Sequence, residues 1–416
     1  MLKYLTKGVI ENSSPNGIAW NTLGTTIVVA SNNSLYYYNL PLFEGQLNET
    51  YLNNIPNNLV PFCTNILGSN IISLTTERYC HDIDETSYLG KNPDGMIALS
   101  RRDYPVTTFN FQGIQKFNIS LRNQNNDLDV IYCIDWITSS INSSNMYCGG
   151  KNVIYCYNIN KDIYYRFCLS KRSDKAKLKQ KGLVSAVTMK TTGIGSNSVI
   201  ASGTFSSSIW LHDLNDDSSN IQLLDNNNQH FKKMGGITKL EWIKTHNNVD
   251  FYILSSHRND KYLRIWDVRN PNKVLHYLER PSSTSQRYGF DMNLDIGNSI
   301  NIIAGDSQGF LSLYNIEINN IEIYSSLNIN QNQNYKDTLI TNNFQLNHKV
   351  RNIQKYPNIK LLIKQQIDTT SVPFVLVKHK KLICTLSGER LNSIDNLEET
   401  STNINCNTKI QLWYIC

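Results

Sequence analysis

The sequence predicts an all-β fold in which seven four-stranded blades form one closed β-propeller. Short apolar segments rich in β-branched and aromatic residues recur along the chain, and turns of Gly, Asn and Ser separate them at close intervals. No segment shows convincing amphipathic helical periodicity. The length of 416 residues is one that propellers reach as a single domain, so we expect residues 1–416 to form one unit.

The clearest repeat spans residues 236–280, where ITKLEWI, FYILSSH and YLRIWDV supply three successive strands. It holds Trp266 and Asp267, the Trp-Asp pair that ends the third strand of many propeller blades. Similar copies precede it at residues 181–224 and follow it at residues 285–317. This period predicts a WD-repeat β-propeller.

Weaker copies complete the ring. GIAWN, TIVVASN and LYYYNL predict the first blade, MIALSRR and VTTFNF the second, and VIYCIDW, NMYCGG and VIYCYNI the third. KLICTLS and IQLWYIC belong to the last blade, whereas LLIKQQI and FVLVKHK cannot both be assigned. The strand that closes the ring comes either from residues 1–9 or from the C-terminal IQLWYIC. Trp210, Trp242, Trp266 and Trp413 fall within predicted strands, so we expect them in the core.

Three segments do not fit the blade period. Residues 41–59 are a predicted loop insertion, residues 319–360 an Asn-rich insertion between blades six and seven, and residues 393–407 a polar loop within the last blade. Long polar segments without a strand pattern are typical of surface loops.

Composition favours a protein of the nucleus or cytosol. Residues 1–20 lack the apolar run of a secretory leader, and no stretch reaches the ~18 apolar residues of a membrane span, so we expect no membrane association. The nine cysteines show no zinc-type spacing, which indicates reduced, mostly buried thiols. The net charge of +6 suits an acidic partner such as RNA only where it is concentrated on one surface.

Motifs for catalysis are missing from the sequence. It contains no Walker loop, no His-Glu-x-x-His, no Ser elbow and no Cys-x-x-Cys. We therefore expect no enzyme, no cofactor, no metal site and no small-molecule substrate.

Several phrases resemble the telomerase Cajal body protein family, WD-repeat proteins of small nuclear ribonucleoproteins. They are KGLVSAV with SGTFSSSIWL, GGITKLEWI with LRIWDVRNP, SQRYGFDMN with AGDSQGFLSLYN, and CTLSGERL followed by the terminal KIQLWYIC. ALSRRDYPVTTFNF is similar to the family's second blade. The chain departs from animal members in having almost no N-terminal extension. A related budding-yeast nuclear WD-repeat protein, associated with splicing, is a second relative.

The resemblance implies a nuclear, non-catalytic protein, found in nuclear bodies and in part in the cytoplasm. It implies recognition of H/ACA small Cajal body RNA or telomerase RNA, together with ribonucleoprotein proteins, in the localisation and assembly of those particles. Two alternatives remain: a splicing factor of small nuclear ribonucleoproteins, and a general scaffold whose basic surface meets an acidic protein.

Positive charge falls mainly on one predicted face. In a propeller, the turns between second and third strands share a face with the linkers from each blade to the next. This placement predicts an RNA-binding surface, because Arg and Lys contact phosphates and unpaired bases stack on neighbouring aromatic rings. The alternative for the Lys-rich linker between blades three and four is a solvated connector. The candidate RNA-binding residues are Arg101, Arg102, Tyr104, Lys151, Arg172, Lys175, Lys177, Lys179, Lys181, Arg258, Lys261, Arg287 and Arg390, with Tyr262 and Tyr288 beside them.

Overall fold

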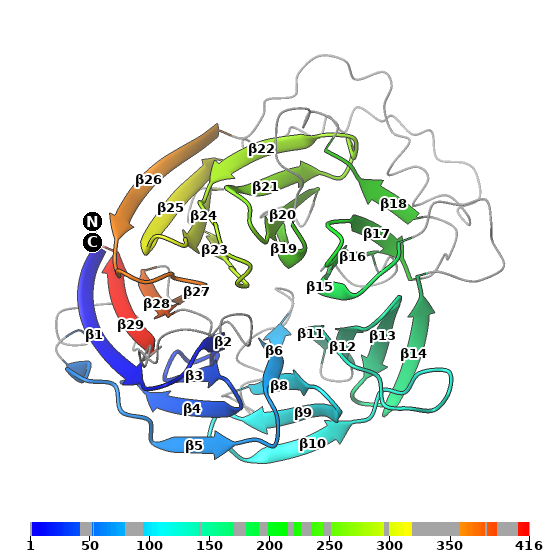
Figure 1. Cartoon of the computed structure of the whole chain (residues 1–416), viewed down its shortest axis with the longest axis horizontal. Coiled ribbons are helices and arrows are strands. Elements are labelled where there is room, and N and C mark those ends of the chain that lie inside the picture. The colour runs from blue at the N-terminus through cyan, green and yellow to red at the C-terminus, as the bar shows by residue number, and fades with distance from the viewer. Residues whose placement is uncertain are drawn as a thin grey trace, which may run out of the picture.

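The computed structural model confirms the ring of seven blades (Figure 1). It describes residues 2–41, 52, 54–79, 95–140, 143–169, 180–190, 199–214, 220–225, 235–243, 251–294, 299–317, 358–378, 381–388 and 407–415. The first strand of every blade lies next to the central axis and the fourth lies on the rim. Within each blade, neighbouring strands pair antiparallel in the order of the chain, apart from the closing strand described below and the short β7 (Arg78–Tyr79), which pairs in parallel with the first strand of blade three.

The first three blades follow the chain from residue 15 to residue 168. Blade one is β2 (Pro15–Trp20), β3 (Thr26–Ser31), β4 (Ser34–Asn39) and β5 (Cys63–Ile66). Blade two is β6 (Ile71–Thr76), β8 (Met96–Arg101), β9 (Tyr104–Asn110) and β10 (Gln115–Ile119). Blade three is β11 (Cys133–Ser140), β12 (Ser143–Gly149), β13 (Val153–Asn158) and β14 (Ile163–Cys168), with the short β7 (Arg78–Tyr79) added to its sheet.

The remaining blades complete the circle. Blade four is β15 (Val184–Met189), β16 (Val199–Thr204), β17 (Ile209–Asp213) and β18 (Asn220–Leu223). Blade five is β19 (Ile237–Ile243), β20 (Tyr252–His257), β21 (Tyr262–Asp267) and β22 (Val274–Glu279). Blade six is β23 (Asp291–Leu294), β24 (Ser299–Gly305), β25 (Phe310–Glu317) and β26 (Asn358–Gln366). Blade seven is β27 (Phe374–Lys378), β28 (Leu382–Ser387), β29 (Thr408–Ile415) and β1 (Leu2–Ile10).

Both chain ends close the ring. β1 pairs antiparallel with β29 from Leu2 opposite Ile415 to Ile10 opposite Thr408. The two alternatives for the closing strand are therefore combined, since the C-terminal segment supplies the third strand of blade seven and the N-terminal segment supplies its outer strand.

The predicted insertions lie inside blades. LLIKQQI belongs to β26 and FVLVKHK to β27, which places the Asn-rich segment between β25 and β26 of blade six. The segment was expected between blades six and seven, and this position is corrected. It also ends before residue 360, because β26 already begins at Asn358. Segment 41–59 joins β4 to β5, and its described end packs Ile55 and Leu59 into the core between blades one and seven. Segment 393–407 falls between β28 and β29 in the chain, and only its last residue lies among the described residues, so its prediction as a loop stays a prediction.

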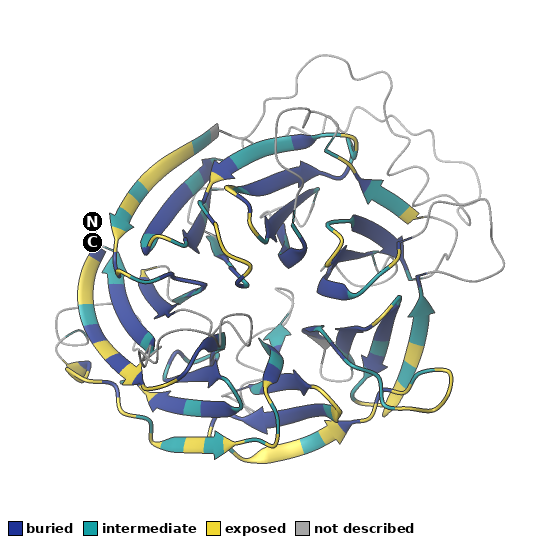
Figure 2. Cartoon of the chain, in the orientation of Figure 1, coloured by how far each residue is buried: buried dark blue, intermediate teal, exposed yellow. Residues whose placement is uncertain are grey.

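The core lies between neighbouring blades. Middle strands such as β3, β17, β20 and β28 are buried along their whole length, whereas the rim strands alternate between buried and exposed residues (Figure 2). Close packing between blades limits side-chain size at the end of the second strand. A Cβ on Gly203 would come within 2.6 Å of Ile237 Cγ2 on the next blade. All four tryptophans expected in the core are buried.

Small polar groups anchor the tryptophan of the clearest repeat. Trp266 Nε1 donates to Ser255 Oγ at 2.8 Å, and the same hydroxyl lies 2.9 Å from His257 Nε2. Burial lowers the pKa of His257, so the ring remains neutral as a hydrogen-bonding group. The described cysteines are free, and three of them, Cys133, Cys148 and Cys384, are buried.

The way the ring closes predicts a different loss of stability for truncation at each end of the chain. Deleting residues 409–416 removes most of β29, so that β1 loses its partner and β28 keeps only β27, whereas deleting residues 2–10 removes only the rim strand. We expect both truncations to lower the free energy of unfolding in urea, with the larger loss for 409–416. A soluble 409–416 truncation with unchanged stability would show that the ring closes in another way.

Candidate functional site

One face of the ring is built by interlocking turns. We call it the turn face: the turns between second and third strands together with the linkers from the fourth strand of one blade to the first strand of the next. Each such turn is hydrogen-bonded to a neighbouring linker. Asn152 N donates to Gly182 O at 2.9 Å, Phe205 N to Leu183 O at 3.0 Å, and Arg258 N to Gly236 O at 2.9 Å. These bonds join blades three to five into one continuous surface.

The structure places the predicted RNA-binding residues in three environments. The exposed group lies on the turn face and consists of Arg102, Tyr104, Lys151, Lys181 and Lys261. The half-buried or buried group consists of Arg101, Arg258 and Arg287. Arg172, Lys175, Lys177, Lys179 and Arg390 lie outside the described residues, so their role stays a prediction.

Arg101 has a structural position. Only 8% of the residue is exposed, its Nη2 donates to Thr107 Oγ1 at 3.2 Å, and its guanidinium carbon lies 4.3 Å from the centroid of the Tyr104 ring. Burial lowers the pKa of this guanidinium. We therefore correct its assignment from a surface contact to a support for Tyr104, whose ring is 41% exposed. Tyr288 is also corrected, because it is fully buried.

An aromatic platform was missed in the sequence. Phe205, 39% exposed, occupies the turn between β16 and β17. The Tyr132 ring meets it edge-on at 6.1 Å between centroids, and the Arg258 guanidinium carbon lies 5.0 Å from the Phe205 centroid. Arg258 Nη1 also donates to Ser285 O at 2.7 Å, which fixes the guanidinium. The signal in the sequence was an aromatic residue within a turn of small polar residues, SGTFSSS.

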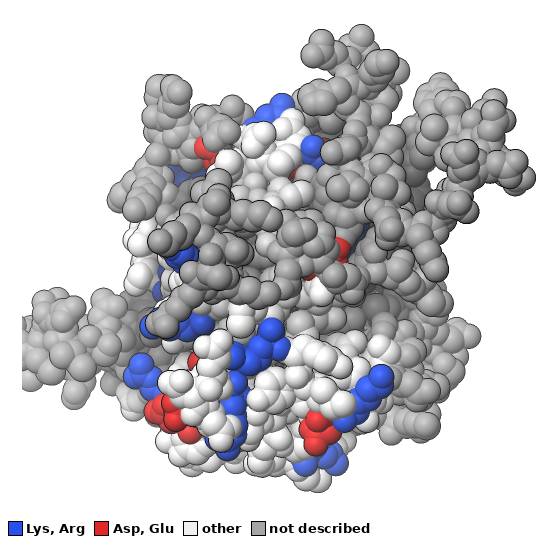
Figure 3. Space-filling model, turned by 90° about the vertical axis from the view of Figure 1, so that its right-hand side faces the viewer, with Lys and Arg blue, Asp and Glu red and all other residues white. Residues whose placement is uncertain are grey.

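Lysines flank this platform. Lys151 forms an isolated bridge with Leu183, whose carbonyl accepts the Phe205 amide, and Lys181 lies two residues before Leu183. The blade edge shown in Figure 3 differs from this arrangement. There the Lys and Arg atoms form separate groups, some with Asp or Glu atoms beside them, so the described residues of that edge make no continuous basic surface.

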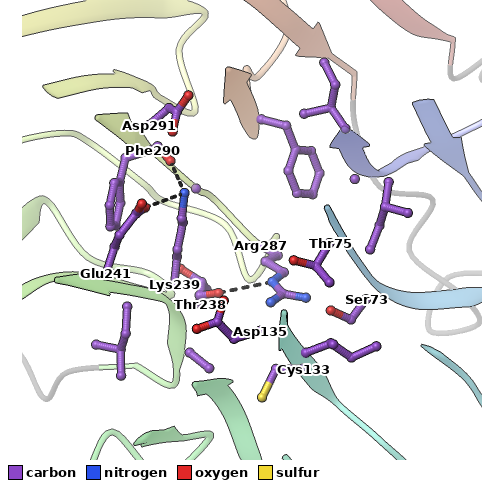
Figure 4. Close-up of a pocket in the computed structure, with 18 of the residues that line it drawn as sticks. Ser73, Thr75, Cys133, Asp135, Thr238, Lys239, Glu241, Arg287, Phe290 and Asp291 are labelled. Atoms are coloured by element: carbon purple, nitrogen blue, oxygen red, sulfur yellow. Dashed lines mark hydrogen bonds and ion pairs between the residues drawn. The ribbon is translucent and has the colours of Figure 1, made fainter. Parts of the chain in front are cut away.

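The central channel contains a cavity of about 240 Å³ lined by the first strands of all seven blades. Arg287 reaches into it from the linker between β22 and β23 (Figure 4). Its Nε donates to Thr238 O at 3.1 Å in blade five, and its Nη1 to Ile72 O at 3.4 Å in blade two. Arg287 was predicted to be a surface contact, and this is corrected, because its side chain forms hydrogen bonds to two blades across the channel.

Charges deeper in the channel balance one another. Arg78 forms an ion pair with Asp135 and lies 3.5 Å from Glu241 Oε1, while Lys239 Nζ lies 2.9 Å from Glu241 Oε2. Lys239 Nζ also donates to Phe290 O at 2.7 Å (Figure 4). Because acidic and basic groups alternate here, the channel is a poor path for a polyanion, and the turn face is the better candidate interface.

Asp291 faces this network from β23. Its Oδ2 accepts the Val377 amide at 2.7 Å. The pKa of Asp291 is raised to about 6, chiefly by burial, which outweighs the lowering by nearby Lys239, while Glu241 also raises it. The described residues include no group of three or more His, Cys, Asp or Glu side chains placed to hold a metal ion. Among them, no helix has the length and apolarity needed to cross a membrane.

The blade order, the interlocked turn face and the buried Trp266 define the protein as a seven-bladed WD-repeat β-propeller. It is similar to telomerase Cajal body protein 1 of Mus musculus, with 27% identity over 305 residues, and of Mesocricetus auratus, with 26% identity over 306 residues. Each match covers 72% of this chain and 51% or 50% of the relative. The resemblance found in the sequence phrases is confirmed, and the chain spans about half the length of these curated relatives.

Two further comparisons concern the fold. A solved structure described as U3-55K superposes with a TM-score of 0.55 at 8% identity and covers 98% of both chains, which supports the propeller architecture alone. No family model matches the chain.

Asp291 gives a prediction for pH. Its folded pKa of about 6 lies above the ordinary value of 3.8, so the folded state keeps the proton to higher pH than the unfolded state. Its contribution to stability is therefore complete below pH ~4 and is lost as pH rises through ~6, by an amount on the order of 1–3 kcal/mol. Urea unfolding of the wild type and of Asp291→Asn between pH 4 and pH 8 measures this, and the variant should gain stability relative to the wild type as pH rises. Parallel curves for the two proteins would contradict the assignment.

Proposed function

We propose that this protein binds single-stranded parts of a small nuclear RNA with its turn face and serves as a binding and escort subunit of a nuclear ribonucleoprotein, without catalysis. The observation that carries the proposal is the Phe205 platform, where an exposed ring is held between Tyr132 and the guanidinium of Arg258. Proteins that bind unpaired nucleotides stack the bases on such rings and on Arg planes.

Charge around the platform supports a phosphate backbone. No described carboxylate forms an ion pair with Arg102, Lys151, Lys181 or Lys261. These four side chains lie on the same face as Phe205 and are exposed. Cations without a protein partner can exchange their counterions for phosphates, which makes binding strong at low salt. We keep Arg172, Lys175, Lys177, Lys179 and Arg390 as proposed contributors on this face.

The relatives guide the choice of RNA. Their printed name associates them with telomerase and the Cajal body. We therefore propose telomerase RNA or an H/ACA small Cajal body RNA as the ligand, the nucleus as the site of action, and proteins of the same particles as partners. A spliceosomal RNA, or an acidic protein in place of RNA, would be the competing outcomes.

Phe205→Ala tests the platform in the purified protein. Because Phe205 is partly exposed, we expect little change in stability, whereas loss of one stacked base should weaken RNA binding by roughly 5- to 100-fold. Fluorescence anisotropy with a labelled single-stranded uridine 12-mer measures the affinity. Lys161→Glu, on the turn between β13 and β14 of the opposite face, is the control and should bind nearly as the wild type does.

Charge reversal tests the phosphate contacts. Lys151→Glu/Lys181→Glu should lower the affinity and flatten the dependence of log K on log salt by roughly one unit for each lost contact. Lys161→Glu changes the net charge by half as much as the double variant, so the two are compared per reversed charge in the same titration. An equal effect per reversed charge would mean that the turn face has no special role.

Crosslinking in cells identifies the RNA. Tagged wild type and a Phe205→Ala variant of equal abundance are crosslinked, and the bound RNA is sequenced. Enrichment of telomerase or H/ACA RNA that the variant loses supports the proposal, spliceosomal RNA supports the splicing alternative, and no enriched RNA supports a protein scaffold.

A further inference from the structure

A second concave site lies on the turn face between blades five and six. It is a groove of about 570 Å³ whose walls include Asn259, Lys261, Tyr262, Ser282, Ser307 and Gln308. The first three come from the turn between β20 and β21, Ser282 from the linker between β22 and β23, and the last two from the turn between β24 and β25. A volume of this size lies within the ~300–1,000 Å³ typical of sites for small ligands.

Ser282 is the unusual residue of the groove. Only 4% of it is exposed, yet its hydroxyl has no hydrogen-bond partner among the described residues. A buried hydroxyl without a partner is costly, and because this oxygen is shielded from solvent, a rotation about the Cα–Cβ bond of Ser282 would be needed to present it to a ligand atom in the groove. Nearby, Ser307 Oγ donates to Pro281 O at 3.2 Å and lies 3.3 Å from both the amide and the hydroxyl of Ser283, which leaves the Ser283 hydroxyl able to accept a further bond.

The charges of the groove argue against a phosphate on its floor. The Arg264 guanidinium is only 1% exposed and already forms an ion pair with Asp260, with Asp225 Oδ2 at 3.6 Å from its Nε. A phosphate would therefore meet two carboxylates near the one guanidinium. Lys261, exposed at the rim and in no described ion pair, is the cation available to a phosphate outside the groove.

The lining suits an uncharged ring with both donors and acceptors. The amides of Asn259 and Gln308 can donate and accept, as can the serine hydroxyls. Tyr262 and Pro281 add flat apolar surface to the walls. The hydrogen-bonding edge of a nucleobase presents this mixture of groups, and unpaired bases of RNA are bound in such a way.

Arg258 connects the groove with the Phe205 platform. Arg258, which lies over Phe205, directly precedes Asn259 in the same turn. The Arg258 side chain also reaches Ser285, in the linker that supplies Ser282. A strand of RNA stacked on Phe205 would therefore arrive at the groove within the same turn.

We propose that this groove holds one unpaired nucleobase of the bound RNA and reads its hydrogen-bonding edge through Ser282, with the phosphate of that nucleotide on Lys261. This inference rests on the proposed RNA-binding function and assigns base selectivity to this groove, while Phe205 supplies stacking that does not depend on the base.

Ser282→Ala tests the inference with little risk to the fold. Because the removed hydroxyl has no hydrogen-bond partner among the residues that the structure describes, stability to urea should stay equal or rise. Labelled 12-mers of adenosine, cytidine and uridine are the probes in anisotropy titrations. We expect the wild type to prefer one of the three by at least about fivefold and Ser282→Ala to lose about that factor for the preferred oligomer alone.

Phe205→Ala is the matched comparison, since it should weaken all three oligomers by a similar factor. If the wild type binds all three equally and Ser282→Ala changes nothing, the base site is overturned while RNA binding stands. If the wild type binds none of them, the proposed function fails and the base site fails with it. Tighter binding of a phosphoserine peptide than of any oligomer, abolished in Lys261→Ala, would overturn the nucleobase assignment in favour of a peptide site.

Discussion

The pairing of β1 with β29 is the constraint on which the rest of the structure depends. It joins the two ends of the chain within one sheet, over eight residue pairs from Leu2–Ile415 to Ile10–Thr408. Without it, β29 would be an open edge. The chain would also lose the connection by which β1, paired in blade seven, runs directly into β2 of blade one. Closing the ring is what brings the seven first strands around one axis and the turns of all blades onto one surface.

That surface is assembled from several neighbouring blades. The Phe205 platform takes Tyr132 from the linker into blade three, Phe205 from blade four and Arg258 from blade five. The groove beside it takes its walls from blades five and six. Backbone hydrogen bonds between each turn and a neighbouring linker set these distances, so the positions of the proposed binding side chains depend on the rigid scaffold and little on their own loops.

The sequence predicted those strands and blades whose pattern lies within a short stretch of the chain. Period and composition were enough for the all-β class and for blades four to six, because strands with Trp266 or its equivalents repeat there in order. The same was true of the buried tryptophans. The pairing of the two chain ends could not be assigned from the sequence. The paired segments lie at opposite ends of the chain, and no residue pattern in either one indicates the other as its partner. The Asn-rich segment was misplaced for a similar reason, because LLIKQQI pairs with a strand far upstream.

The candidate site was predicted less well. Arg101 and Arg102 are adjacent and chemically alike, but the pleat turns the first inward onto Thr107 and leaves the second in water. Arg287 has the same appearance in sequence and instead spans the channel. Phe205 went unnoticed because its importance comes from Tyr132 and Arg258, which no local pattern connects to it. The sequence was enough to predict which face of the ring carries these turns and linkers. Which of their cations are exposed and which are buried depends on side-chain packing, which the sequence does not reveal.

The contacts across the channel also bear on why this ring has seven blades. Arg287, in the linker between blades five and six, donates to the backbone of blade two, and Arg78, on a strand that pairs in parallel with blade three, reaches Glu241 of blade five. Each side chain has a fixed length, so these contacts form only at the present diameter of the ring, while the terminal ladder fixes its circumference. A duplication or loss of one blade would change both lengths together. Extra residues are therefore accommodated more easily in the connections between strands, such as the one from β25 to β26, than as an added blade.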